Sequence, residues 1–394
     1  MKPKSVNRPK PHQPGSTIRL LTAVPICDGH DSAINTINLE FIRHGIEVIY
    51  LGYHRSARDI ARAAIQEGVR AIGISSYNGG HVEFVAELID LLKQHGAGGI
   101  GIFGGGGGTI TARDAAVMKR KGVDAIFFAG TPLADIVEFV TRTYSNPRKP
   151  PKPPTPAGRG AGALMDIRLG ALLTAAETSA GSPRRIRHGS PPTPRPASRV
   201  IGITGPGGAG KTTLIDELVL RFLNANPGAR LAILSHDPSL VGQGALLGDR
   251  AAMIHSQDDR VFMRSLATRG QAGGLSPATE PCLQLLRHSG FDLVLVETVG
   301  IGQEAMPFGR ELVDKVVLVM SPDYGSRLQL QKIVMLDAAD IVVVNKSDMA
   351  AAKTAAAEIG QRLAFNHRGQ KLVSTMAKHH RDTGVDELFN LLQP

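Results

Sequence analysis

Short apolar runs alternate with stretches of helical spacing over residues 18–142. About ten to fifteen residues of helical periodicity follow each run. Strands alternating with helices in this way predict a parallel, doubly wound α/β domain of the flavodoxin-like type, whose ligands bind beyond the carboxyl ends of the strands. We therefore expect function in the loops that follow the strands. The apolar runs are IRLLTAVPI (18–26), IEVIYLG (46–52), VRAIGIS (69–75), GIGIFGG (99–105) and VDAIFFAG (123–130).

A second alternation of strands and helices predicts another doubly wound α/β domain over residues 199–394. Its predicted strands are RVIGIT (199–204), LAILS (231–235), DLVLVE (292–297), KVVLVM (315–320) and DIVVVN (340–345).

Residues 143–198 differ in character from both domains and predict a Pro/Arg-rich linker. PRKPPKPPTP and SPPTPRPASR occur near its two ends, and such a density of proline excludes a continuous helix or sheet. Between them ALMDIRLGALLTAAE (163–177) has enough apolar residues for one helix. That helix either docks on a domain or is only partly populated.

Composition and charge narrow the class of protein. The chain has 394 residues, enough for two cores, and no apolar run approaches the roughly 18 residues that cross a bilayer. Two cysteines, Cys27 and Cys282, are too few for a disulfide framework or a thiolate zinc site, which favours the cytoplasm. The net charge of +10 comes from residues 1–19 and 143–199, at about +5 and +8, and leaves the rest at about −3. This distribution argues against a folded nucleic-acid-binding face, and we expect neither a nucleic-acid nor a membrane partner.

The sequence GPGGAGKT (205–212) follows a predicted strand and precedes a helix, as a phosphate-binding P-loop requires. Glycines let backbone N–H groups turn toward phosphates, and the helix N-terminus adds a favourable dipole. The lysine neutralises the β- and γ-phosphates and the threonine hydroxyl can ligate Mg²⁺. The predicted phosphate-binding residues are Gly205, Gly207, Gly208, Ala209, Gly210, Lys211, Thr212 and Thr213.

Two further sequences indicate that the nucleotide is GTP. In NKSD (345–348), Asn345 and Asp348 can read the edge of guanine, with Lys346 between them. In ETVG (297–300), Glu297 ends a strand where a carboxylate can organise the water shell of a metal ion. We assign catalysis of GTP hydrolysis to Lys211, Thr212 and Glu297.

This half of the chain resembles the metallochaperone-like G proteins that serve cobalamin-dependent methylmalonyl-CoA mutase. The resemblance implies that Asp237, Asp249 and Glu297 join Thr212 around Mg²⁺, that 238–250 and 298–304 are nucleotide switches, and that the G domain forms a homodimer. LVGQ after DPS departs from the basic residues often found there. Arg264 and Arg269 are candidates for phosphate contacts or for an interface. The resemblance is carried by HDPS (236–239), QGALLGDR (243–250), FMRSLATRG (262–270) and ETVGIGQ (297–303).

Chemistry of another kind follows the strands of the first domain. Asp28 and His30 lie in the loop after its first strand, followed later by SSYNGG (75–80) and GGGGG (104–108). A carboxylate two residues before a histidine can hold one ring nitrogen and turn the other toward a metal. Five successive glycines at a strand end leave room for a large flat group beside the backbone.

These residues resemble the cobalamin-binding domain of adenosylcobalamin-dependent mutases and methionine synthase. The resemblance implies that His30 ligates cobalt from below, Asp28 supports it, Ser75 meets the displaced base, and Gly104, Gly105 and Gly106 border its tail. Ala33 replaces the last glycine of the first motif. The match is closest to fused isobutyryl-CoA mutases, in which a cobalamin domain, a G domain and a substrate barrel follow one another.

The order of the two domains leads to one expected function. We expect a cobalamin-binding and GTP-hydrolysing subunit of a split adenosylcobalamin-dependent acyl-CoA mutase, of the isobutyryl-CoA or methylmalonyl-CoA type, whose barrel is a partner chain. GTP hydrolysis would gate cofactor loading and protection. One alternative is a stand-alone GTP-dependent chaperone that delivers cobalamin to a complete mutase, and another is a corrinoid carrier or sensor.

Overall fold

The computed structural model describes residues 17–25, 32–106, 108–146, 161–180, 198–240, 243–300, 307–309, 311–324 and 334–393. Nearly all of the predicted basic tail, much of the predicted linker and part of the predicted switch 298–304 lie outside these ranges. The chain divides into two compact units. Unit 1 is Met1–Leu164 with Ser239–Leu246, and unit 2 is Met165–Pro238 with Leu247–Pro394. The units differ from the predicted domains because the linker helix groups with unit 2 and Ser239–Leu246 with unit 1.

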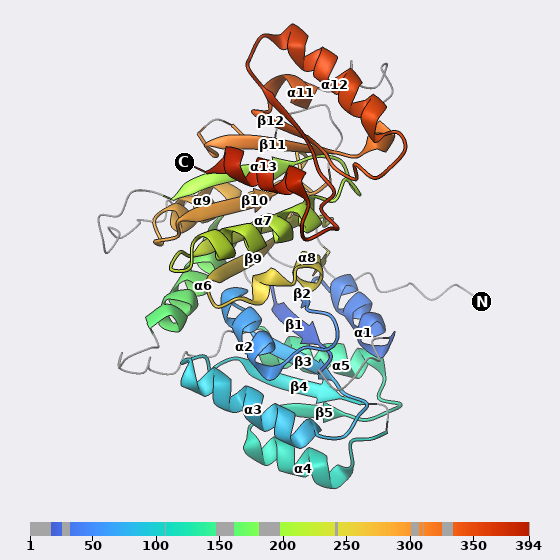
Figure 1. The fold of residues 1–394 in the computed structure, drawn as a ribbon. Coiled ribbons are helices and arrows are strands. Elements are labelled where there is room, and N and C mark those ends of the chain that lie inside the picture. The colour runs from blue at the N-terminus through green and yellow to red at the C-terminus, as the bar shows by residue number, and fades with distance from the viewer. Residues whose placement is uncertain are drawn as a thin grey trace, which may run out of the picture. The chain divides into compact units, whose positions relative to one another are not determined.

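Unit 1 is built on a sheet with the strand order β5-β4-β3-β1-β2-β8 (Figure 1). The β1–β2, β1–β3, β3–β4 and β4–β5 pairs are parallel, as the alternation of strands and helices predicted. The strands are β1 (Arg19–Ala23), β2 (Glu47–Tyr50), β3 (Ala71–Ser75), β4 (Gly101–Gly105), β5 (Ala125–Phe127) and β8 (Ala245–Leu247). The helices are α1 (Ser32–Arg43), α2 (Ala57–Gln66), α3 (His81–Gln94), α4 (Ala112–Lys121) and α5 (Leu133–Tyr144).

Local chemistry fixes where two helices of unit 1 begin. Ser56 precedes α2 and Thr111 precedes α4, and each side chain accepts a hydrogen bond from the backbone N–H three residues later. The carboxylates of Asp59 and Asp114 accept a hydrogen bond from the backbone N–H of the capping residue, which completes a capping box in each case. Both helices therefore start directly after the strand-end loops and leave those loops at the carboxyl edge of the sheet.

Unit 2 is built on a seven-stranded sheet with the order β13-β12-β11-β6-β10-β7-β9, in which every pair is parallel. The strands are β6 (Arg199–Thr204), β7 (Leu231–Asp237), β9 (Val261–Ala267), β10 (Leu293–Glu297), β11 (Lys315–Met320), β12 (Ile341–Val344) and β13 (Lys371–Ser374). The helices are α6 (Ala161–Ser179), α7 (Lys211–Ala225), α8 (Asp249–Ala252), α9 (Thr279–Arg287), α11 (Val334–Ala338), α12 (Ala352–Asn366) and α13 (Thr383–Leu392). Short 3₁₀ turns occupy His255–Gln257 and Pro322–Tyr324.

The predicted fold class, two parallel α/β units, is confirmed, but the pattern missed three strands. β9 contains Arg264, a charge inside a buried strand, and β13 is four residues long with exposed ends. β8 has only three residues. None of these segments shows the unbroken apolar run by which buried parallel strands are recognised.

The helix inside the predicted linker is α6, and it packs as part of unit 2. Leu169, Leu173 and Ala176 are buried in the same core cluster as Phe262 and Cys282. This packing decides between the two alternatives left by the sequence in favour of a docked helix.

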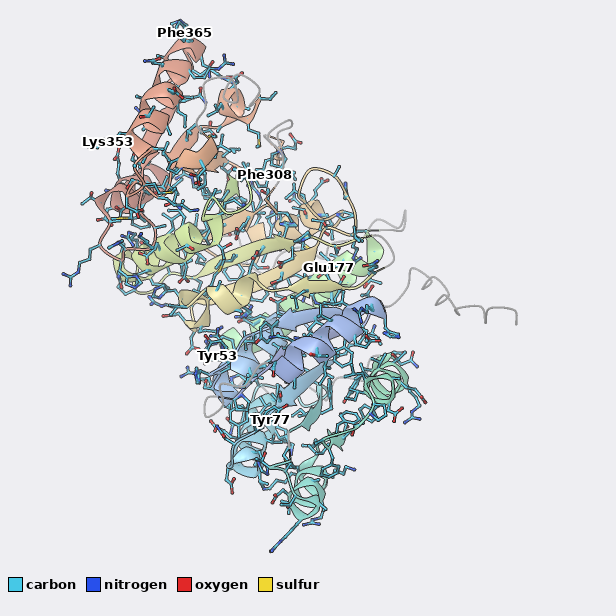
Figure 2. The ribbon with its side chains drawn as sticks, turned by 90° about the vertical axis from the view of Figure 1, so that its right-hand side faces the viewer. Tyr53, Tyr77, Glu177, Phe308, Lys353 and Phe365 are labelled. Atoms are coloured by element: carbon cyan, nitrogen blue, oxygen red, sulfur yellow. The ribbon has the colours of Figure 1, made fainter. Side chains whose placement is uncertain are left out.

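A buried ion pair also holds α6 in unit 2. Glu177 of α6 (Figure 2) accepts hydrogen bonds from the fully buried guanidinium of Arg264, including one of 2.9 Å to Nε, and its backbone carbonyl accepts one from Arg269. Arg264 is thereby committed to an intramolecular contact rather than to a phosphate.

No helix among the described residues is long and apolar enough to span a membrane.

Truncation of one leucine in α6 tests whether the helix belongs to the unit. Leu173 has no exposed surface, so Leu173→Ala should lower the free energy of unfolding by about 2–5 kcal/mol. The neighbouring Leu172 is 50% exposed, and Leu172→Ala should change it by less than about 0.5 kcal/mol. Chemical denaturation of the full chain measures both, and equal losses in the two variants would contradict the packing of α6.

Candidate functional sites

The P-loop of unit 2 connects β6 to α7. Gly205, Gly208 and Gly210 have φ angles of 144°, 73° and 87°, a backbone conformation that residues with a Cβ rarely adopt. Lys211, the first residue of α7, folds back over the loop, and its Nζ donates to the carbonyls of Gly205 at 3.0 Å and Pro206 at 3.1 Å. The loop therefore has the turned backbone and the central ammonium group of a phosphate cradle.

The predicted metal ligands Thr212 and Glu297 are brought together at one end of the P-loop. The Thr212 hydroxyl donates to Glu297 Oε1 at 2.8 Å, and Glu297 is 3% exposed. The second carboxylate oxygen, Oε2, makes no hydrogen bond among the described residues. A buried carboxylate oxygen without a partner is costly, and a divalent cation would supply the missing partner.

Two more predicted ligands belong to neighbouring elements. Asp237 ends β7 and is buried, and Asp249 begins α8 and accepts a hydrogen bond from Ser235. Asp249 also interacts electrostatically with Lys211 and Glu297. Hydroxyl and carboxylate oxygens are the donors that Mg²⁺ prefers, and Thr212, Asp249 and Glu297 supply them. Among the described residues no three acidic, histidine or cysteine side chains are gathered as metal ligands, so Asp237 does not complete this set in the structure.

Burial disturbs the protonation of three charged groups at the P-loop. Burial lowers the pKa of Lys211 and raises that of Asp249. For Glu297, burial and the negative charge of Asp249 raise the pKa to about 8. A bound divalent cation would favour the ionised form of these carboxyl groups, because it places positive charge beside them.

The residues predicted to read guanine follow β12. Asn345 is buried, donates from Nδ2 to the Ala209 carbonyl of the P-loop at 2.9 Å, and accepts at Oδ1 from the Thr375 hydroxyl at 3.0 Å and the Ala377 N–H at 3.1 Å. Lys346 has a φ of 59°, and this left-handed residue turns the chain toward Asp348.

The loop after β13 was missed by the sequence reasoning. Besides Thr375 and Ala377, it contributes Lys378, whose Nζ donates to Asp348 Oδ2 at 2.6 Å. That hydrogen bond lowers the pKa of Asp348, which favours the ionised carboxylate. The sequence could have pointed to this loop by its position, because it follows the carboxyl end of a parallel strand as the other site loops do.

The predicted phosphate-binding residue Thr213 is exposed on the first turn of α7.

His236 is a second residue to which the sequence assigned no role. It is buried at the end of β7, with Nδ1 2.7 Å from the carbonyl oxygen of Glu297 and Nε2 2.7 Å from the hydroxyl of Thr279. Burial lowers its pKa to about 4. The ring is therefore a neutral link between β10 and α9.

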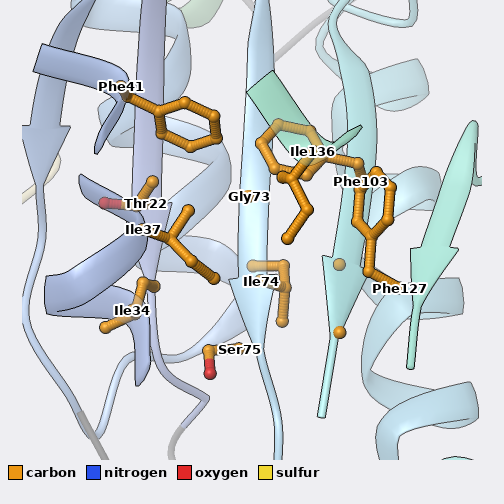
Figure 3. A pocket seen from close by; sticks show the side chains of 12 residues that line it. Thr22, Ile34, Ile37, Phe41, Gly73, Ile74, Ser75, Phe103, Phe127 and Ile136 are labelled. Atoms are coloured by element: carbon orange, nitrogen blue, oxygen red, sulfur yellow. The ribbon is translucent and has the colours of Figure 1, made fainter. Parts of the chain in front are cut away.

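Unit 1 contains a small apolar cavity between its sheet and helices α1 and α5. Figure 3 shows Ile34, Ile37 and Phe41 of α1 on one side, and Ser75 at the carboxyl end of β3. Gly104 and Gly105 also line the cavity. Three of the predicted cobalamin contacts thus share one hollow, whereas Gly106 does not line it, and Asp28 and His30 lie outside the described residues.

The glycine run has a physical reason that the sequence did not reveal. A Cβ on Gly104 would stand 2.8 Å from the Ile74 carbonyl oxygen, and one on Gly105 would stand 2.7 Å from that of Phe127. Gly106 similarly faces the carbonyl of Ser76. These glycines allow neighbouring strands to approach closely. Gly108 differs from these three glycines, because it has a φ of 100° and no atom lies within 4 Å of its Cβ position.

The cavity volume is about 40 Å³, whereas a single water molecule needs about 10–15 Å³, so the hollow has room for only a few waters. A nucleotide base is several times larger. The side chains that line the cavity are mostly apolar and would suit an apolar ring. The cavity has to widen before a ring of that size can enter.

Comparisons with known proteins give matches over both units. A family model described as B12 binding domain matches residues 18–137, and one described as methylmalonyl Co-A mutase-associated GTPase MeaB matches residues 190–393. The fused isobutyryl-CoA mutase of Geobacillus kaustophilus is 36% identical over 406 residues, which cover 98% of this chain and 36% of that protein. The corresponding enzyme of Cupriavidus metallidurans is 37% identical over 397 residues, covering 95% and 35%.

Another relative aligns only with part of the chain. The methylmalonic aciduria type A homolog of Mus musculus is 38% identical over 156 residues, which cover 39% of this chain and 37% of that protein. The chain thus spans about a third of the length of the curated relatives it matches. Its likeness to the fused isobutyryl-CoA mutases covers both units, and confirms the resemblance inferred from the sequence. The chain therefore belongs to the methylmalonyl-CoA mutase-associated GTPase family MeaB, with a B12-binding domain ahead of its GTPase domain.

Proposed function

We propose that this chain is the cobalamin-binding and GTP-hydrolysing subunit of an adenosylcobalamin-dependent acyl-CoA mutase, of the isobutyryl-CoA or methylmalonyl-CoA type. The acyl-CoA is bound by a barrel on a partner subunit, and GTP hydrolysis gates cofactor loading and protection. The observation that supports the proposal most is a single alignment with fused isobutyryl-CoA mutases that includes both the B12-binding unit and the GTPase unit. We further propose that the subunit works in the cytoplasm as a homodimer through its GTPase unit.

The residues of unit 2 perform distinct tasks in this proposal. Lys211 now bonds to the Gly205 and Pro206 carbonyls, and phosphate oxygens of GTP replace them as its acceptors. Thr212, Asp249 and Glu297, together with Asp237, hold Mg²⁺, which neutralises charge on the phosphates. Asn345 and Asp348 orient guanine, and Asn345 transmits its position to the P-loop through the Ala209 carbonyl.

The residues of unit 1 ligate and shield the corrinoid. Cobalamin, when bound, supplies the homolysis of a cobalt–carbon bond that begins the rearrangement. Ala23 at the end of β1 pairs with Ile74 of β3, so the chain enters the loop containing Asp28 and His30 beside Ser75. We assign cobalt ligation to His30, support of its ring to Asp28, and contact with the displaced base to Ser75.

A purified chain that contains only an acyl-CoA mutase barrel tests the proposed function. Addition of this protein with adenosylcobalamin and GTP should produce mutase turnover, and both chains should elute as one complex during size-exclusion chromatography. The subunit donates its bound cofactor to the reaction, so its removal should abolish turnover. Turnover that persists after removal would instead identify a chaperone that transfers cobalamin and leaves.

The absorption spectrum of bound adenosylcobalamin tests the assignment of His30. The wild-type chain should show a corrinoid whose own base is displaced by imidazole. His30→Ala should bind more weakly and lose the spectral signature of a nitrogen ligand, because no other group then occupies that position. His54→Asn, in the loop after β2, is the control and should match the wild type. A wild-type spectrum with the corrinoid's own base still coordinated would refute the assignment.

The raised pKa of Glu297 predicts a pH dependence of stability in protein free of metal and nucleotide. The unfolded carboxyl loses its proton near pH 4.5, whereas the folded one retains it to about pH 8. The folded state thus binds more protons across this window, and stability falls as the pH rises through it. Glu297→Gln removes this cost, so its advantage over the wild type should grow by more than about 1 kcal/mol between pH 5 and pH 8.

Denaturant unfolding at several pH values measures this difference between Glu297→Gln and the wild type. The control is Glu280→Gln, which removes an exposed carboxyl of α9 and is measured in the same way. A difference between Glu297→Gln and the wild type that does not vary with pH would contradict the raised pKa of Glu297.

A further inference from the structure

His236 lies where two strands of unit 2 separate. β7 pairs with β10 up to Leu234 and Val296, and beyond this point β7 continues beside β9 while Glu297 of β10 remains paired with β6. Ligands of doubly wound sheets bind outside the carboxyl ends of the strands, and His236 lies at such an end. The Nδ1 atom of its imidazole lies 2.7 Å from the carbonyl oxygen of Glu297.

The two contacts of the ring define its tautomer. A carbonyl oxygen only accepts hydrogen bonds, so Nδ1 carries the proton that it donates to Glu297. In the neutral ring Nε2 is then an acceptor. The Thr279 hydroxyl lies 2.7 Å from Nε2 and 2.7 Å from the carbonyl oxygen of Ser276, and its single proton can be donated to only one of them. When it is donated to Nε2, the Ser276 carbonyl still accepts from the backbone N–H of Thr279 at 3.0 Å. Every polar atom in the chain of contacts therefore has a partner.

This chain of contacts fixes the backbone from which the Glu297 carboxylate projects. On its β6 side Glu297 is held by strand pairing, with Ile203 as its partner. On its β7 side the pairing has ended, and the His236 ring takes the place of the missing strand contact. The position of this carboxylate matters for both of its oxygens. Oε1 accepts the hydrogen bond from the Thr212 hydroxyl, and Oε2 has no hydrogen-bond partner among the described residues.

We propose that His236 is a positioning residue for the metal site of the GTPase: its Nδ1–H holds the Glu297 main chain, and Thr279 of α9 holds the ring. The proposal rests on the proposed binding of Mg²⁺ by Glu297. Partners that orient metal ligands from outside the coordination sphere typically contribute 10- to 100-fold in metal affinity.

The test is the affinity of the full-length, GDP-loaded chain for Mn²⁺, measured by electron paramagnetic resonance. His236→Leu removes both contacts, and should weaken Mn²⁺ binding by roughly 10- to 100-fold. GDP binding in EDTA should stay unchanged, because the P-loop and Asn345 are untouched. His236→Asn, whose amide N–H lies near the position of Nδ1, should restore most of the affinity for Mn²⁺.

Two variants of Thr279 supply a milder test. Thr279→Val removes the hydroxyl that holds Nε2, and should weaken Mn²⁺ binding in the same direction as His236→Leu. Thr279→Ser keeps the hydroxyl and should resemble the wild type. Equal Mn²⁺ affinity in the valine and serine variants would overturn the proposal, as would a parallel loss of Mn²⁺ and EDTA-resistant GDP binding in His236→Leu. If the wild type binds no Mn²⁺ with GDP, the proposed GTPase site itself fails, which is a separate result.

Discussion

The hydrogen bond from Thr212 to Glu297 joins the two strand ends on which the nucleotide site depends. It forms because β6 and β10 pair in parallel with Ile203 opposite Glu297, so the P-loop and the acid leave the sheet side by side. Glu297 and Lys211 are buried, whereas Thr212 and Asp249 are partly exposed. A buried acid is stable only when partners satisfy it, and a divalent cation would be such a partner for Oε2 of Glu297. The geometry of the sheet thus places this acid beside the P-loop.

Unit 1 uses the same edge of a parallel sheet for a different chemistry. Its strand ends carry glycines, a serine and aliphatic side chains where unit 2 carries buried charges. Gly104 and Gly105 bring β4 close to its neighbours, and Phe41 packs edge-on against Phe103 with ring centroids 6.1 Å apart. The result is an apolar hollow beneath Ser75, suited to a ring rather than to an ion.

The helix α6 shows that domain boundaries drawn from composition differ from those drawn from packing. Proline on both sides marks the surroundings of α6 as a linker, but Leu173 and Glu177 face the core of unit 2. Arg264 lies inside β9 with its guanidinium fully buried, and Glu177 and Thr174 on α6 accept its hydrogen bonds. These contacts make the burial tolerable, because an unpaired buried charge costs several kcal/mol. The GTPase unit therefore begins inside the proline-rich region.

The sequence alone determined the two α/β units, the P-loop, the guanine-reading NKSD and Glu297, because these depend on the periodicity of apolar residues and on contiguous motifs. The resemblance to a known family added Asp237 and Asp249. Only the tertiary structure decided the contacts between residues far apart in the chain: Asn345 with the loop after β13, Glu177 with Arg264, and His236 with Glu297. Those contacts depend on strand order and on which side chains are buried together, neither of which is written in local spacing. The same reason explains the glycines of β4, since their neighbours are the carbonyls of other strands.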